Sequence, residues 1–425
     1  MIDTIYQHFS KAYKVNTDSR KVEQDAVFFA LKGENFDAND FALQVAEAGV
    51  ASLVVADRKD LPKHERILIV DDALKTLQDL AAYHRSQSKA TVLSITGTNG
   101  KTTTKELVSA VLAQKYNIIH TMGNLNNHIG VPLTLLSIKP ETEIAVVEMG
   151  ANHPGEIDFL CKIADPDYGL ITNIGKAHLE GFGSFEGVIK TKTELYRHIK
   201  SHGKAVFVNQ GNPLLWEQSE GQERISYGRH CAAFCPVAPA ACNPYLSVGW
   251  RKHLIQTHLV GSYNFENVAA AIGVGQYFGV DENAIVEALE AYTPTNSRSQ
   301  VVETQKNRVI MDAYNANPTS MRAALINFAS ICGEQHLLIL GDMRELGTAS
   351  EEEHRNILGL MKELKFKEAL LVGSNFSAYN VNPDWKTFAK VEDLCQYLEG
   401  HPISGKIILV KGSNSIQLGK VLPLL

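Results

Sequence analysis

The segment that most restricts the fold of this chain is a short glycine turn, Gly97-Thr98-Asn99-Gly100-Lys101-Thr102-Thr103. It follows an apolar run over residues 92–96 and leads into a stretch of helical periodicity over residues 105–112. A glycine turn between a strand and a helix presents free backbone N–H groups and the positive end of the helix dipole. The pattern predicts a phosphate-binding loop in which Lys101 reaches the β- and γ-phosphates of a nucleotide and the Thr102 hydroxyl ligates Mg²⁺. A glycine turn without a ligand is the alternative.

Strands and helices alternate along most of the 425 residues, which predicts an α/β fold with parallel sheets covered by helices. At roughly 150 residues per domain, a chain of this length holds about three domains. Polar stretches near residues 85–89 and 292–297 divide it into a small α/β domain at 1–86, a central parallel-sheet domain at 87–297 and a C-terminal Rossmann-like domain at 298–425. Apolar runs at 308–312, 337–340, 369–373 and 406–410 are the strands expected in the last of these.

Charge and hydropathy exclude several kinds of partner. The chain has 41 basic and 47 acidic residues, a formal charge of −6, so it has no overall basic field to hold a nucleic acid. The first residues lack the basic and apolar regions of a signal peptide, and no run of 18 apolar residues occurs. We therefore expect a cytoplasmic protein without membrane insertion, and we expect a monomer.

Three side chains downstream of the loop are candidates for the same site. An apolar run over 144–148 ends in Glu148, and His178 follows the run over 170–174. The carboxyl ends of parallel strands meet at one edge of a sheet, where a carboxylate can hold Mg²⁺ against phosphates. A helical stretch over 185–199 carries Lys190 and Lys192. Taken alone, each of these residues is more often a structural or solvated side chain.

Only two residues separate the glycines of the loop, and this form, T-G-T-N-G-K-T, resembles the Mur ligases and their folylpolyglutamate synthetase relatives, which couple ATP cleavage to amide-bond formation. Residues 148–153, 177–184 and 190–194 also look like Mur ligase blocks. The resemblance implies that Lys101, Glu148, His178 and Lys192 are catalytic, with Lys192 carbamylated. It implies Mg²⁺ ligands at Thr102, Glu148 and His178. The ATP-binding residues that it implies are Gly97, Thr98, Asn99, Gly100, Lys101, Thr102, Thr103, Asn264, Asn267, Arg298 and Asp312.

Further blocks, at 17–20, 29–37, 122–132, 312–318, 340–347 and 411–413, are similar to the branch of the family that adds D-alanyl-D-alanine to UDP-N-acetylmuramoyl-tripeptide. This similarity implies an ATP-dependent ligase of peptidoglycan precursor synthesis that works through an acyl phosphate. The substrate-binding residues implied are Ser19, Arg20, Lys32, Asn126, Asn127, Asn315 and Asn317. Two positions depart from the family pattern: Ser297 replaces a frequent glycine, and Asn414 replaces a frequent basic residue.

Three alternatives remain open. One is the Mur ligase that adds the third amino acid, and a more distant one is a folylpolyglutamate synthetase, which usually has glycine where this chain has Thr102. The third is a nucleotide-gated binding protein of the same fold that does not catalyse ligation. The presence of Glu148, His178 and Lys192 together argues against the third, because a protein that only binds has no need of all three.

Overall fold

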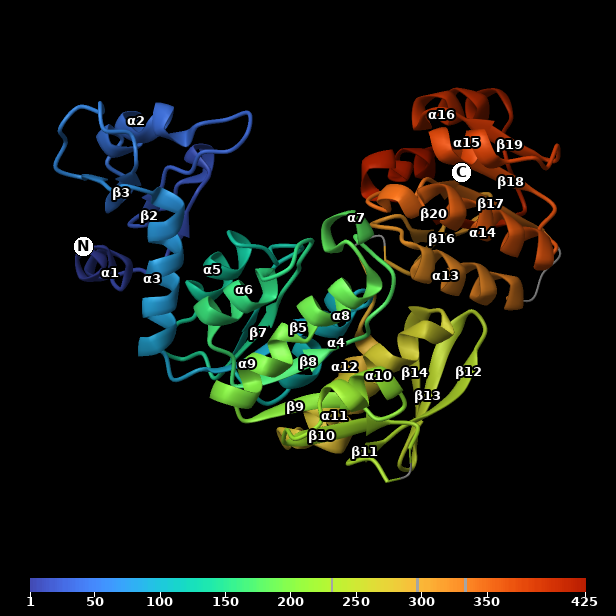
Figure 1. Ribbon diagram of the computed structural model, residues 1–425, viewed down its shortest axis with the longest axis horizontal. Coiled ribbons are helices and arrows are strands. Elements are labelled where there is room, and N and C mark those ends of the chain that lie inside the picture. The colour runs from blue at the N-terminus through green and yellow to red at the C-terminus, as the bar shows by residue number, and fades with distance from the viewer. Residues whose placement is uncertain (231, 296–297, 332–334) are drawn as a thin grey trace.

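The computed structural model describes residues 1–230, 232–295, 298–331 and 335–425. Four β-sheets follow one another along these residues. In Figure 1 the blue N-terminal part and the orange-to-red C-terminal part lie on either side of the green central part. Within the described residues, no helix combines the length and the apolar character needed to cross a membrane.

The N-terminal part is a four-stranded parallel sheet in the order β1-β2-β3-β4. Its elements are α1 (Ile2–Phe9), β1 (Val15–Asn16), η1 (Ser19–Lys21), β2 (Val27–Phe29), η2 (Ala38–Phe41), α2 (Ala42–Glu47), β3 (Leu53–Ala56), β4 (Ile67–Ile69) and α3 (Ala73–Gln87). Helix α3 contacts α1 on one side and two helices of the central part, α5 (Gly130–Leu135) and α6 (Glu156–Ala164), on the other. It therefore joins the first two parts through a shared apolar core.

The central part is built on a seven-stranded parallel sheet in the order β11-β10-β9-β8-β5-β7-β6. Its strands are β5 (Thr91–Thr96), β6 (Ile118–His120), β7 (Ile144–Glu148), β8 (Tyr168–Ile171), β9 (Ala205–Asn209), β10 (Arg224–Gly228) and β11 (Cys235–Pro236). Its other helices are α4 (Lys101–Leu112), α7 (Leu179–Phe182), α8 (Phe185–Lys192), α9 (Glu194–His202), α10 (Pro213–Gln218), α11 (Phe265–Tyr277) and α12 (Glu282–Ala291). The parallel sheet expected from the strand and helix pattern is confirmed.

Helix α11 packs against α4 through small residues. A Cβ atom at Gly275 would lie 2.4 Å from Cγ1 of Val111, so only glycine permits this approach. The segment Gly273-Val274-Gly275, which superficially resembles part of a dinucleotide-binding motif, therefore serves helix packing. Because α4 begins at the phosphate loop, this packing also fixes the loop relative to the sheet.

The sequence analysis missed a three-stranded antiparallel sheet, β12 (Ala238–Cys242), β13 (Tyr245–Trp250) and β14 (His253–Val260). Buried and more exposed residues alternate along β14, as expected for a strand with one face on the core. Figure 1 shows this sheet in yellow, below the C-terminal part.

The C-terminal part is a six-stranded sheet in the order β15-β16-β20-β17-β18-β19, in which only the β15–β16 pair is antiparallel. Its strands are β15 (Gln300–Glu303), β16 (Arg308–Asp312), β17 (His336–Gly341), β18 (Ala369–Val372), β19 (Trp385–Phe388) and β20 (Ile407–Lys411). Its helices are α13 (Pro318–Ser330), η4 (Gly347–Ala349), α14 (Ser350–Glu363), α15 (Ser374–Tyr379), α16 (Val391–Gly400), η5 (Asn414–Ile416) and η6 (Leu418–Leu424). All four strands predicted here are present, whereas β15 and β19 were not predicted.

Candidate active site

The phosphate loop has a backbone that requires glycine at two positions. Gly97 and Gly100 have φ angles of 144° and 78°. A Cβ at Gly97 would lie 2.0 Å from Oγ1 of Thr172, and one at Gly100 would lie 2.5 Å from Oδ1 of Asn267. Helix α4 begins directly after Gly100, so its first N–H groups face the loop, as the sequence predicts.

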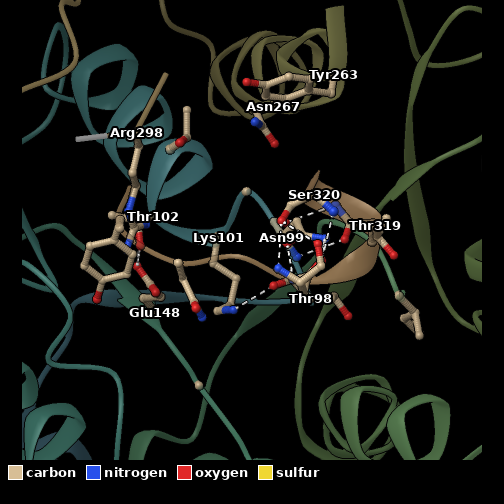
Figure 2. A pocket seen from close by; sticks show the side chains of 18 of the residues that line it. Thr98, Asn99, Lys101, Thr102, Glu148, Tyr263, Asn267, Arg298, Thr319 and Ser320 are labelled. Atoms are coloured by element: carbon tan, nitrogen blue, oxygen red, sulfur yellow. Dashed lines mark hydrogen bonds between the residues drawn. The ribbon is translucent and has the colours of Figure 1, made fainter. Parts of the chain in front are cut away.

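A cavity of about 850 Å³ lies between the central and C-terminal parts, with the phosphate loop along one side. Figure 2 shows Lys101, Thr102 and Glu148 close together in it, with Asn267 and Tyr263 above them. The predicted site residues that line the cavity are Thr98, Asn99, Gly100, Lys101, Thr102, Thr103, Asn126, Asn127, Glu148, His178, Asn264, Asn267, Arg298, Asp312, Asn315 and Asn317.

The Lys101 side chain folds back over its own loop. Its Nζ donates hydrogen bonds to the carbonyl oxygens of Gly97 (2.9 Å) and Thr98 (3.2 Å), one of which is drawn in Figure 2. Burial lowers the pKa of this amine, and the negative charge of Glu148 offsets part of that shift. An amine held only by carbonyl oxygens is ready to exchange them for the oxygens of a phosphate.

Glu148 ends strand β7 with only 1% of its surface exposed. Its Oε2 accepts a hydrogen bond of 2.8 Å from the Thr102 hydroxyl, and its Oε1 accepts one of 2.7 Å from Nδ2 of Asn126. Both donors are neutral, and a buried carboxylate with neutral partners suits a nearby cation. Within the described residues, no three His, Cys, Asp or Glu side chains converge on one point, so a cation here would need oxygens from a bound nucleotide.

His178 lines the cavity and lies immediately before α7. Its Nδ1 atom lies 2.5 Å from Oε2 of Glu345, a residue of the C-terminal part. The structure thus places His178 in the cavity, as predicted, and adds a carboxylate partner that the sequence analysis did not anticipate.

Lys192 lies at the end of α8 and does not line the cavity. It is 2% exposed, its Nζ donates a hydrogen bond of 3.3 Å to the carbonyl oxygen of Ala151, and the amine lies 5.4 Å from the centre of the Phe182 ring. Burial, aided by the positive charge of Lys101, holds the pKa of Lys192 well below its ordinary value. Burial therefore makes the neutral form of this amine easier to reach than in an exposed lysine.

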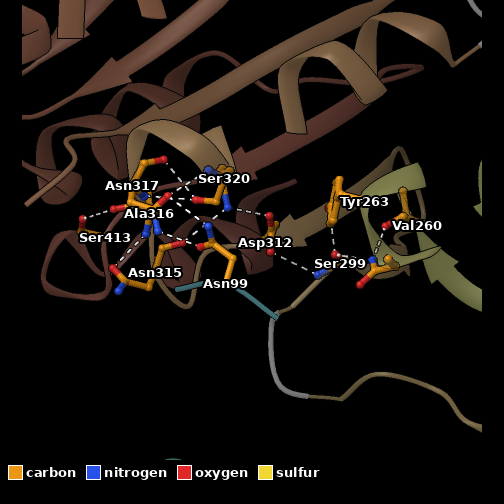
Figure 3. A network of polar contacts seen from close by, with 12 residues as sticks. Asn99, Val260, Tyr263, Ser299, Asp312, Asn315, Ala316, Asn317, Ser320 and Ser413 are labelled. Carbon is orange, nitrogen blue, oxygen red and sulfur yellow. Dashed lines mark hydrogen bonds and ion pairs between the residues drawn. The ribbon is translucent and has the colours of Figure 1, made fainter. Parts of the chain in front are cut away.

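The side-chain amide of Asn99, in the phosphate loop, contacts that of Asn317, in the C-terminal part. Nδ2 of Asn317 donates to Oδ1 of Asn99 at 2.7 Å, and Nδ2 of Asn99 donates back at 3.5 Å. Figure 3 shows this pair next to Ser320, with which Asn317 forms a capping box at the start of α13. The phosphate loop and α13 are thereby connected through a pair of side chains.

The segment that enters the C-terminal part also lines the cavity, through Arg298, Ser299 and Asp312. The Arg298 guanidinium stacks on the Tyr314 ring at 3.7 Å from its centre. Asp312 accepts a hydrogen bond from the backbone N–H of Ser299 (3.3 Å) and forms an ion pair of 2.6 Å with Lys411. Ser297, the first departure from the family pattern, lies outside the described residues.

Asn264 and Asn267 belong to a chain of hydrogen bonds that connects α4 to the start of α11. The Thr104 hydroxyl donates to Oδ1 of Asn267 (3.0 Å), and Nδ2 of Asn267 donates to Oδ1 of Asn264 (2.8 Å). Nδ2 of Asn264 then donates to the carbonyl oxygen of Val260 (2.8 Å). Both amides line the cavity, but most of their polar groups already bind protein atoms.

The predicted residues of the N-terminal part lie away from this cavity, whose lining includes none of Ser19, Arg20 and Lys32. The Arg20 side chain is 84% exposed and pairs with Asp18 at 2.8 Å. Lys32 belongs to a backbone bridge with Asp37. The role of these three residues in substrate binding stays a prediction.

Asn127 and Asn315 line the cavity but also stabilise the backbone locally. Oδ1 of Asn127 accepts hydrogen bonds from the N–H groups of Ile129 (3.1 Å) and Gly130 (2.9 Å) at the start of α5. Oδ1 of Asn315 accepts one from the N–H of Ala316 (2.8 Å). Their Nδ2 groups are the atoms left to contact a substrate.

The sequence analysis missed Lys411, Tyr314 and Arg229 as cavity residues. Lys411 ends strand β20, is 2% exposed and directly precedes a glycine, a pattern that could have identified it. Lys411 thus brings a positive charge into the cavity. It lies three residues before Asn414, the position where this chain lacks the basic residue that is frequent in the family. No signal in the sequence marks Arg229, which reaches the cavity from the turn after β10 and stacks on Phe265 at 4.9 Å.

Three family models match the chain along its length: "Mur ligase family, catalytic domain" over residues 11–85, "Mur ligase middle domain" over residues 95–275 and "Mur ligase, glutamate ligase domain" over residues 297–414. The UDP-N-acetylmuramoyl-tripeptide--D-alanyl-D-alanine ligase of Bacillus subtilis is 35% identical over 422 residues, which cover 96% of this chain and 92% of the relative. The chain belongs to the Mur ligase family.

Solved structures agree with this assignment. The crystal structure of MurF from Acinetobacter baumannii resembles this Mur ligase with a TM-score of 0.84 at 32% identity, covering 96% of this chain and 92% of the other. The MurF ligase of Thermotoga maritima in complex with ADP has a TM-score of 0.83 at 26% identity, covering 97% and 96%. The α/β fold and the family resemblance inferred from the sequence are therefore confirmed.

Proposed function

We propose that this Mur ligase adds D-alanyl-D-alanine to UDP-N-acetylmuramoyl-tripeptide with cleavage of ATP to ADP and phosphate. Relatives of that name cover almost the whole chain. The observation that carries the proposal is one cavity lined by a phosphate loop, a buried carboxylate, a histidine and a second wall from the C-terminal part. A protein that only binds nucleotide has no use for all four.

ATP is assigned to the groove between the phosphate loop and the C-terminal part, as supported by the relative crystallised with ADP. Residues 97–103 surround the phosphates, while Arg298, Asp312, Asn264 and Asn267 face the rest of the nucleotide. In this arrangement residues 1–86 hold the UDP end of the substrate, 87–297 carry out the chemistry and 298–425 close over the nucleotide. Ser19, Arg20 and Lys32 are assigned to the UDP end, and Asn126, Asn127, Asn315 and Asn317 to the peptide end.

Thr102, Glu148 and His178 are assigned to Mg²⁺. The buried Glu148 carboxylate with its two neutral donors fits a divalent cation, since Mg²⁺ is commonly held by one or two protein ligands together with substrate phosphates. The ion, when bound, neutralises charge on the transferring phosphate. The Thr102 hydroxyl, which donates to Glu148, would be one of the oxygens that hold the ion.

Lys192 is assigned as the carbamylated lysine. Carbamylation requires a neutral amine, and the buried position of Lys192 favours that form. The product is an anionic, carboxylate-like group that can neutralise nearby positive charge. Such a group would also place a negative charge near the positive charge of Lys101.

The reaction follows from this placement. The tripeptide carboxylate attacks the γ-phosphorus, the bond to the β-phosphate oxygen breaks, and ADP leaves an acyl phosphate behind. The D-alanyl-D-alanine amine then attacks the acyl carbon, loses a proton, and expels phosphate as the amide forms. Lys101 turns from the carbonyl oxygens of its loop to the phosphate and stabilises its charge. Contact between the central and C-terminal parts keeps water from hydrolysing the acyl phosphate.

The decisive experiment measures ADP release with both substrates present and with each omitted. ADP release that requires UDP-N-acetylmuramoyl-tripeptide and D-alanyl-D-alanine together supports the proposal. ADP release that needs a UDP-dipeptide and a single amino acid would instead identify the ligase for the third residue. ATP binding without turnover under any of these conditions would identify a binding protein. Variant tripeptides in the same assay identify the third residue.

A further inference from the structure

Two residues far apart in the sequence, His178 and Glu345, meet at the edge of the cavity. Nδ1 of His178 lies 2.5 Å from Oε2 of Glu345, and the backbone N–H of Glu180 donates to the carbonyl oxygen of Glu345 at 3.5 Å. His178 belongs to the central part, whereas Glu345 lies in the loop between β17 and η4 of the C-terminal part. The contact therefore joins the two parts, and one of its two residues, His178, is a proposed magnesium ligand.

The backbone on both sides of this contact is unusual. His178 and Glu345 have φ angles of 51° and 62°, in the left-handed region that residues with a side chain rarely adopt. Such conformations persist only where the surroundings hold them, and they cluster at functional sites. Here two residues in this conformation touch each other, which indicates that both segments are shaped to bring these side chains together.

The loop that carries Glu345 is held firmly within the C-terminal part. The N–H of Met343 donates to Nε2 of His354 (3.1 Å), and the N–H of Arg344 donates to the Ser413 hydroxyl (2.9 Å). The Met343 side chain is 1% exposed. The loop therefore holds Glu345 in a fixed position. When the central and C-terminal parts are in contact, its carboxylate lies next to His178.

We propose that Glu345 is a positioning residue of the magnesium site. With Oε2 of Glu345 2.5 Å from Nδ1, the carboxylate favours the ring proton of His178 on Nδ1, which leaves Nε2 as the ring nitrogen available to the metal. Histidine ligands commonly donate their other N–H to a carboxylate that fixes the tautomer and the ring orientation. Because Glu345 comes from the C-terminal part, docking of that part completes the metal site. The inference rests on the proposed role of His178.

A second ion pair between the same two parts provides a matched control. Nζ of Lys176 lies 3.0 Å from Oε1 of Glu353, in helix α14. Lys176 is two residues from His178 but lies outside the lining of the cavity. Removing this pair loosens the contact between the parts and leaves the partner of His178 in place.

The experiment measures Mn²⁺ affinity of the full-length protein in the presence of ADP, by the electron paramagnetic resonance signal of free Mn²⁺. Glu345→Ala is expected to weaken Mn²⁺ binding by about 10- to 100-fold, the usual cost of losing such a partner. Glu345→Gln is expected to stay close to the unmodified protein, because its amide oxygen accepts the same N–H. Lys176→Ala is expected to leave the affinity unchanged, and thermal melts confirm that each variant is folded.

Three results would overturn the inference. An unchanged affinity in Glu345→Ala would mean that the carboxylate does not affect metal binding. An increased affinity would mean that the carboxylate competes with the metal for His178. An equal loss in Lys176→Ala would mean that Glu345 acts only by holding the two parts together. A His178→Ala variant shows whether a negative result concerns the role of Glu345 or the assignment of His178 to the metal. If His178→Ala binds Mn²⁺ normally, the metal assignment itself is wrong, whereas a loss in His178→Ala without one in Glu345→Ala rejects only the role of Glu345.

Discussion

The hydroxyl of Thr102 donates a hydrogen bond of 2.8 Å to Oε2 of Glu148, so the first turn of α4 is tied to the carboxyl end of β7. These residues are 46 positions apart and belong to different motifs. Their contact shows that the sheet brings the phosphate loop and the acidic strand end to one point. Both oxygens are then in place for a shared cation.

The first prediction concerns this pair. Thr102→Val removes the hydroxyl but keeps the shape of the side chain, so the protein should fold while turnover falls by about 10²-fold, in the range for losing one preorganised polar contact. The concentration of Mg²⁺ that gives half-maximal ADP release should rise. Ser109→Ala, on the same helix and away from the cavity, should leave both quantities unchanged. An unaltered Mg²⁺ requirement in Thr102→Val would contradict the assignment.

The second prediction concerns Lys101. Lys101→Met should lower the rate of ADP release by about 10²- to 10³-fold, because one preorganised charge on the phosphate is lost. The fold should remain intact, since the hydrogen bonds of Nζ to described residues go to two carbonyl oxygens of its own loop. A thermal melt checks folding and a coupled ADP assay checks turnover. An unchanged rate would show that the phosphate loop does not hold the reacting phosphate.

Local patterns predicted the parts of the site that depend on short segments. The phosphate loop was recognisable because a buried strand, two glycines and a helix start lie within a dozen residues. Glu148 and His178 could be placed beside it because both follow buried strands, whose carboxyl ends must share an edge. The structure confirms that both line the same cavity.

Contacts between distant segments were not predictable from the sequence. Nothing near His178 marks Glu345 as its partner, since 167 residues and several elements separate them (345 − 178 = 167). Lys411 was overlooked because a lysine at the end of a strand is usually solvated, whereas here it is paired with Asp312. The antiparallel sheet was missed although β14 alternates, because β12 consists of Ala, Pro and Cys, of which Ala and Pro are depleted in strands.

The third prediction concerns the amide pair of Asn99 and Asn317. Asn317→Ser keeps a side chain that can cap α13 but is too short to reach Asn99, whereas Asn317→Ala loses both functions. Both variants should have a higher KM for ATP, because the contact between loop and α13 is lost. Only Asn317→Ala should also lose about 1 kcal/mol of stability in urea denaturation. Equal stability of the two variants would contradict the capping role, and an unaltered KM would contradict the role of the pair in nucleotide binding.

The fourth prediction concerns carbamylation of Lys192. Protein incubated with ¹³C-bicarbonate should show one carbamate resonance in its carbon NMR spectrum, because burial favours the neutral amine. The resonance should disappear in Lys192→Met and persist in Lys190→Met, where the exposed neighbour on the same helix is changed instead. A resonance that survives in Lys192→Met would assign the modification to another lysine.

The fifth prediction concerns His84, which ties the N-terminal part to the central part. The ring is 4% exposed, its Nε2 donates to the carbonyl oxygen of Ile138 (2.9 Å), and its Nδ1 lies 3.3 Å from the Tyr6 hydroxyl. Burial lowers the pKa of His84 below its ordinary value of about 6.5. The unfolded chain therefore takes up a proton more readily than the folded protein. The stabilisation from neutral His84 is full above about pH 6.5 and is lost as the pH falls below that value.

Urea denaturation at about pH 7.5 and about pH 5.5 tests this dependence. His84→Gln keeps a donor for the carbonyl oxygen of Ile138 and has no titrating ring, so its free energy of unfolding should fall less between the two pH values than that of the unmodified protein. His258→Gln, which changes an exposed histidine of β14, should fall as much as the unmodified protein. Because burial also lowers the pKa of other histidines, such as His120 and His354, the difference between the two variants is the informative quantity. If His84→Gln and His258→Gln lose the same free energy, protonation of His84 does not oppose folding.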